Sequence, residues 1–128
     1  MKRICVFMNV FNVHVNRSPI KGVAKDIVYK KGQFLNASLD KASDKNERSS
    51  LVINADNGTK IIVVQIAGLI ARRILGFISA NHNLEQGERF GLIRFGSRVD
   101  LYMPLDAVTK CVVGDTVIAG ESVLASLN

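Results

Sequence analysis

Two short runs rich in Ile and Val, residues 51–54 and 60–66, flank the segment Asp56-Asn57-Gly58. Strand-like runs on either side of a short turn ending in Asn-Gly are a strong local signal for a β-hairpin. Further strand-like runs occur at residues 4–15, 23–29, 90–93, 99–103, 109–113 and 122–125. The pattern predicts a mainly β domain with little helix.

Length and composition limit the class of protein. A chain of 128 residues with 48% hydrophobic residues and no Trp is typical of one globular domain. No apolar run reaches the ~18 residues that a membrane-spanning helix needs, and the polar residues after Phe7 argue against a signal peptide. Cys5 and Cys111 lie in separate apolar runs, which predicts buried free thiols rather than metal ligands or a redox pair.

The positive charge is concentrated in the first part of the chain. Residues 1–34 hold seven basic residues and one acidic residue, which accounts for the whole net charge of +6. Such a segment is attracted to anionic surfaces, at ~1 kcal/mol for each basic residue near an anionic membrane. Charge alone leaves three interpretations open: a membrane surface, nucleic acid and a solvated lysine face.

Two segments do not follow the strand pattern clearly. Residues 34–50 are polar and charged, which predicts a long mobile loop with at most one helical turn. Residues 65–78 fit either an amphipathic helix or two short strands bent at Gly68. We favour the strands because Gly68 and Gly76 weaken a helix.

A Gly-Ser pair interrupts residues 90–100, which otherwise resemble one continuous strand. Glycine is unfavourable inside a strand, so Gly96 indicates a bend, a bulge or a place where the backbone reacts. The hydroxyl of Ser97 is a potential nucleophile beside the Gly96 carbonyl. This adjacency suggests that the chain acts on itself.

Local motifs alone indicate no enzyme class. His14, in the first strand-like run, is the leading acid–base candidate, although a single histidine in a strand is more often structural. His82 lies between two asparagines and is interpreted as a surface turn residue. No nucleophile elbow, phosphate loop, dinucleotide fingerprint or metal-ligand spacing is present.

Residues 84–91 and 113–121 form a weak internal echo, each with a strand-like run on either side of a glycine turn. The second copy resembles the turn-and-strand unit of biotinyl and lipoyl carrier domains. No lysine attachment motif accompanies it. The resemblance therefore implies related, barrel-sandwich-like sheets rather than a carrier role.

Four longer segments resemble the phosphatidylserine decarboxylases of the short prokaryotic type, in the right order along nearly the whole chain. They are residues 7–17 with His14, residues 34–48, residues 64–74 and residues 87–100 with Gly96-Ser97. The resemblance implies a proenzyme that cuts itself between Gly96 and Ser97. The products would be a β chain, residues 1–96, and an α chain, residues 97–128, whose first residue becomes a pyruvoyl group.

The same resemblance implies the chemistry and the surroundings of the enzyme. The pyruvoyl group made from Ser97 would be the cofactor, without a metal, and would convert phosphatidylserine to phosphatidylethanolamine, with His14 as the acid or base. A loop over the head group would use Asn36, Ser38, Asn46, Glu47 and Arg48, and Arg17 would meet the lipid phosphate. We expect a peripheral homo-oligomer on the cytoplasmic face of the cell membrane, on an anionic surface and without nucleic acid.

The chain departs from the family pattern at two points. An upstream apolar segment and an Asp-bearing motif that assists self-cleavage are missing, and Arg17 stands where some relatives have a second histidine. We therefore expect a fragment or split product, with exposed strand edges that favour association. The alternatives are a catalytically incomplete remnant that binds anionic lipid and a β module related to lipoyl domains.

Overall fold

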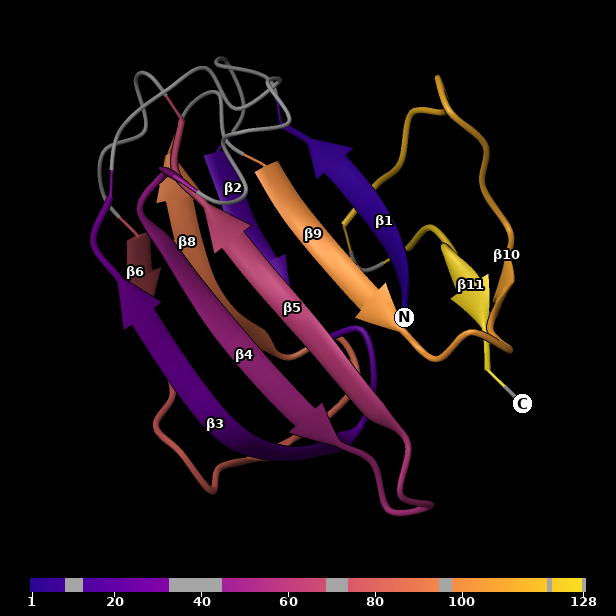
Figure 1. Cartoon of the computed structure of the whole chain (residues 1–128), viewed down its shortest axis with the longest axis horizontal. Coiled ribbons are helices and arrows are strands. Elements are labelled where there is room, and N and C mark those ends of the chain that lie inside the picture. The colour runs from indigo at the N-terminus through magenta and orange to yellow at the C-terminus, as the bar shows by residue number, and fades with distance from the viewer. Residues whose placement is uncertain (9–12, 33–44, 69–73, 95–97, 120, 128) are drawn as a thin grey trace.

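The computed structural model describes residues 1–8, 13–32, 45–68, 74–94, 98–119 and 121–127, and strands dominate this part of the chain (Figure 1). All the pairings between these strands are antiparallel. The largest sheet has the order β1 (Lys2–Phe7), β9 (Arg98–Met103), β5 (Lys60–Ile66), β4 (Arg48–Asn54), β3 (Gly22–Lys30) and β7 (Asn83–Leu84). A second sheet has the order β2 (Val13–Arg17), β8 (Arg89–Arg94) and β6 (Ile74–Gly76), and a small third sheet pairs β10 (Val108–Thr109) with β11 (Ala125–Ser126).

The predicted hairpin is confirmed as β4 and β5. Asn54 pairs with Lys60, and the Ala55 amide donates a 2.9 Å hydrogen bond to the Thr59 carbonyl across the turn. Gly58 has φ +87°, a conformation that side chains with a Cβ rarely adopt. The amide of Thr59 also donates to Asn57 Oδ1 over 3.0 Å. The turn residues therefore set the register of the hairpin.

The hydrophobic core lies between the six-stranded and three-stranded sheets. Its buried residues include Leu51, Ile53, Ile61, Val63, Leu101 and Met103 from the large sheet and Phe90 from β8. The sheets also meet where the Gln65 side chain packs on Gly91, since a Cβ at Gly91 would lie 2.5 Å from Gln65 Nε2. The mainly β prediction is confirmed, and the sheets are not closed into a barrel.

One predicted long strand is divided between the two sheets. Residues 4–15 were expected to form one strand, but β1 ends at Phe7 and β2 begins at Val13 in the other sheet. That prediction was wrong, because each half is apolar enough for a strand while distant partners determine which sheet it joins. The separate strands predicted at 90–93 and 99–103 are confirmed as β8, which ends at Arg94, and β9, which begins at Arg98.

Several predicted boundaries also move. β4 begins at Arg48, so the predicted loop of residues 34–50 is too long at its C-terminal end, and residues 33–44 lie outside the described part. Residues 65–78 were interpreted as two short strands. In agreement with this, β5 ends at Ile66 and β6 covers Ile74–Gly76. The strands predicted at 109–113 and 122–125 are instead the two-residue strands β10 and β11, shifted by a few positions.

Candidate functional site

The bond between Gly96 and Ser97 belongs to the connection from β8 to β9. Both residues lie outside the described part of the chain. Their flanks are described: Arg94 ends β8 in the three-stranded sheet, and Arg98 begins β9 in the six-stranded sheet (Figure 1). The bond therefore joins the two layers of the molecule.

His14 lies in β2, beside the strand that leads to this connection. The backbone of His14 pairs with that of Ile93 on β8, and the backbone of Val13 pairs with that of Arg94. The pairing partner of His14, Ile93, thus lies three residues before Gly96 in the sequence. The fold brings the two segments together although they are far apart in the sequence.

Arg17, at the end of β2, is held by a turn of the protein. Its side chain is half-buried, and Nη1 donates a 2.9 Å hydrogen bond to the Gly87 carbonyl. The same turn docks on Ser18, whose carbonyl accepts from the Gly87 amide over 2.8 Å. A contact between Arg17 and a lipid phosphate stays a prediction.

The predicted loop residues fall into two groups. Asn36 and Ser38 lie outside the described residues, whereas Asn46, Glu47 and Arg48 adjoin the sheet. Asn46 is fully buried, and its Nδ2 donates a 2.7 Å hydrogen bond to the Ala67 carbonyl.

The backbone around Asn46 is bonded as well. The Glu47 carbonyl accepts from the Ala67 amide over 3.0 Å, and Arg48 Nη1 donates to the Asn46 carbonyl over 3.2 Å. A hydrogen bond to Glu47 raises the pKa of the Tyr29 hydroxyl. Residues 46–48 thus fasten the start of β4 to the chain that leaves β5.

A buried ion pair directly follows Ser97 in the sequence. Arg98 Nη2 donates a 3.1 Å hydrogen bond to Asp100 Oδ2. Arg98 Nε lies 2.9 Å from Oδ1, as a charge contact without the alignment of a hydrogen bond. Arg98 is 2% exposed and Asp100 is 0% exposed. We refer to these residues as the Arg98–Asp100 pair.

The pair faces away from the hydrophobic core. Val99, Leu101 and Met103 on β9 all pack in or against the core, and side chains alternate along a strand. Arg98 and Asp100 are therefore on the other face. The Arg-X-Asp spacing, which places both side chains on one face of a strand, is the only local signal of the pair in the sequence. Sequence reasoning missed it because charged residues are usually exposed.

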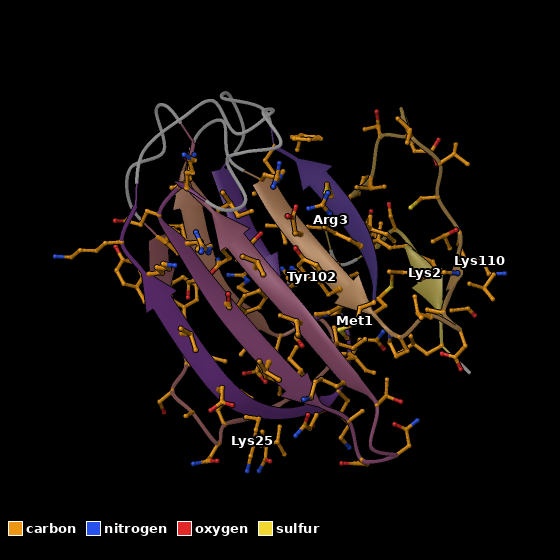
Figure 2. The ribbon with its side chains drawn as sticks, in the orientation of Figure 1. Met1, Lys2, Arg3, Lys25, Tyr102 and Lys110 are labelled. Carbon is orange, nitrogen blue, oxygen red and sulfur yellow. The ribbon has the colours of Figure 1, made fainter. Side chains whose placement is uncertain are left out.

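Residues of β1 extend the polar cluster around Asp100. Arg3 Nη1 is 3.9 Å from Asp100 Oδ2, and a hydrogen bond with Tyr102 raises the pKa of Arg3 (Figure 2 labels Arg3 and Tyr102). Burial raises the pKa of the Cys5 thiol, and its hydrogen bond to Asp100 raises that pKa further. Cys5 and Asp100 are paired positions on β1 and β9.

The basic residues of the first 34 positions do not gather at one place. Lys2 and Arg3 lie on β1, whereas Lys25 lies on β3 at a separate end of the molecule (Figure 2). Lys2 Nζ also donates to the Ala107 carbonyl over 2.6 Å. The described lysines of β3 are exposed and stay available to an anionic surface.

Two kinds of feature are absent from the described part of the chain. No group of three or more His, Cys, Asp or Glu residues there could hold a metal ion. Within the same residues, no helix is both long and apolar enough to cross a membrane.

Comparison with known proteins decides the family. A sequence model of the family described as phosphatidylserine decarboxylase matches residues 1–125, almost the whole chain. The chain belongs to the phosphatidylserine decarboxylase family. No solved structure matches it. The match confirms the resemblance and includes both strands that flank the Gly96–Ser97 bond.

Proposed function

We infer that this chain decarboxylates phosphatidylserine to phosphatidylethanolamine with a pyruvoyl group made from its own Ser97. The observation that carries this proposal is the family match over residues 1–125, which spans Gly96, Ser97 and His14. The fold supports it by pairing the strand that bears His14 with the strand that leads to Gly96.

The self-cleavage uses atoms of the chain and one water. Ser97 Oγ adds to the Gly96 carbonyl carbon, the hydroxyl proton passes to the Ser97 nitrogen, and the peptide C–N bond breaks to leave an ester. Loss of the Ser97 α-proton then breaks the Cβ–Oγ bond, so residues 1–96 leave with a free carboxylate and residue 97 becomes dehydroalanine. Tautomerisation to an imine and hydrolysis, which consumes one water and releases one ammonia, complete the pyruvoyl group.

The flanks of the bond fit a pyruvoyl group at position 97. Arg98, the residue that would follow the group, is buried and begins a strand with neighbours on both sides. When present, the group supplies an electron sink for the electron pair released as carbon dioxide leaves. The position of the group would thus be determined by the sheet.

His14 and Arg17 are the residues that we assign to the substrate. Histidine in general can give and take protons near neutral pH, so His14 suits delivery of a proton to the carbon that loses carbon dioxide. Arg17 would contribute positive charge toward the lipid phosphate. The exposed lysines of β3 favour an anionic membrane surface as the setting.

The test compares wild type with Ser97→Ala and with Ser79→Ala, which removes the same hydroxyl from an exposed residue. Each full-length protein is given phosphatidylserine in detergent micelles, and phosphatidylethanolamine is measured. We expect product from wild type and Ser79→Ala and none from Ser97→Ala. Wild type without activity, but with binding to anionic vesicles, would favour the lipid-binding remnant.

A further inference from the structure

The Arg98–Asp100 pair fixes the chain one residue away from the bond that is proposed to break. β9 lies between β1 and β5. Arg98 pairs with Phe7 on one side and with Ile66 on the other. The guanidinium also lies 5.8 Å from the centroid of the Phe7 ring, within the range of a cation–π contact. Backbone and side chain of Arg98 are therefore both held.

Stability alone does not account for an ion pair at this place. Removal of an ion from water is unfavourable, and apolar side chains of similar volume often stabilise a fold at least as well as a buried ion pair. The Arg98 guanidinium meets the Asp100 carboxylate through two nitrogens, Nη2 and Nε, which we call the guanidinium fork. Unlike an apolar contact, these two contacts fix the orientation of the Arg98 side chain as well as its position. A fixed orientation is valuable where the neighbouring residue must react.

We propose that the Arg98–Asp100 pair is the positioning device for self-cleavage between Gly96 and Ser97. The proposal rests on the proposed function, because it presupposes that the chain cuts itself there. Ser97 Oγ reacts only when it meets the Gly96 carbonyl carbon at the correct angle and distance. Because residue 98 is fixed, fewer backbone torsions would remain to be ordered before the attack.

The same pair keeps its place after the cut. Arg98 and Asp100 both belong to residues 97–128, whereas β1 and β5, on either side of β9, belong to residues 1–96. Cleavage therefore leaves the pair intact and leaves β9 between its two neighbours. The buried guanidinium of Arg98 therefore belongs to the same chain as residue 97 before and after the reaction.

The experiment separates positioning from stability. The full chain is synthesised in a cell-free reaction, and the split is followed over time by gel and intact mass. The double variant Arg98→Met with Asp100→Leu replaces the ion pair by apolar side chains, so the thermal unfolding midpoint is expected to stay near that of wild type. Cleavage is expected to slow by about tenfold or more, because orientation is lost.

Two further variants complete the design. Arg3→Met removes the half-exposed arginine 3.9 Å from Asp100 and leaves the fork intact, so it should cleave at the wild-type rate. Arg98→Lys keeps the charge but loses the guanidinium fork, so the folded variant should cleave more slowly than wild type. If the double variant does not fold, the cleavage rate of Arg98→Lys tests the positioning role in its place.

The outcomes distinguish the positioning role from the proposed function. A wild type that cleaves, together with a folded double variant or Arg98→Lys that cleaves equally fast, overturns the positioning role and leaves the proposed function standing. A wild type that stays in one piece overturns both. Slow cleavage in folded variants, with the Arg3→Met rate unchanged, supports the positioning role.

Discussion

Asp100 is a fully buried carboxylate on β9 that Arg98 and Arg3 share. Its neighbours in the sequence give no sign of this burial, because several charged residues follow the Gly-Ser pair. Its burial depends on β1 and β5, which pair with β9 from far away in the chain. His14 and Ser97 remain predictions, which rest on the segments that resemble the family. The Arg98–Asp100 pair was not predicted, because its surroundings come from distant parts of the chain.

Glu88 offers a pH test at the residue scale. The Glu85 amide donates to Glu88 Oε1 over 3.1 Å and His82 Nε2 lies 2.6 Å from Oε2, and both contacts lower the pKa of Glu88. A carboxylate whose pKa is lowered by folding stabilises the fold at any pH above its pKa in the unfolded chain, which is about 4.3 for Glu. That stabilisation is lost as the pH falls through the pKa of the folded protein. Glu88→Gln should therefore lower the thermal unfolding midpoint slightly at pH 6 and not in strong acid.

The control for this test is Glu121→Gln, at an exposed carboxylate. It should leave the midpoint unchanged at both pH values. An effect of Glu88→Gln that is the same at pH 6 and in strong acid would show that the carboxylate charge is not the cause.

At the scale of elements, the strands with local signals were predicted well and those set by distant partners were not. The β4–β5 hairpin needs only its own turn residues, so its sequence was sufficient. β1 and β2 are joined in sequence but pair with β9 and β8, which come much later. Apolar alternation identifies such strands without showing which sheet each one joins.

Gly58 provides the element-scale prediction. Gly58 has φ +87°, and a Cβ added there would meet no atom within 4 Å. Gly58→Ala therefore introduces backbone strain without a steric clash. We expect a loss of about 1–2 kcal/mol in the free energy of unfolding, measured by denaturant titration. The control Gly76→Ala also meets open space, at a glycine without positive φ. Equal losses in the two variants would contradict the role of the turn conformation.

At the scale of the whole molecule, exposed apolar residues gather on an open strand edge. In the described part of the chain, β7 pairs with β3 only at Gly22 and Val23, and farther along β3 Ile27, Val28 and Tyr29 are exposed by 37%, 57% and 51%. An apolar strand edge with free backbone groups is a template for pairing with another chain. We therefore expect the chain to self-associate through this edge.

Val28→Lys tests this account of association. A charge on the edge strand should shift the molar mass measured by light scattering at micromolar concentration toward the monomer. Val113→Lys places the same charge at a fully exposed residue outside the β3 edge and should change the mass less. A wild type that is already monomeric would contradict the prediction.

The central claim concerns the bond that joins the two sheets, and intact mass tests it most directly. The account predicts two chains, residues 1–96 and 97–128, whose masses sum to that of the uncut chain plus one water minus one ammonia. Ser97→Ala should stay whole. A single uncut wild-type chain would contradict the account. So would two chains whose masses sum to the uncut chain plus one water, because ordinary hydrolysis leaves Ser97 unchanged.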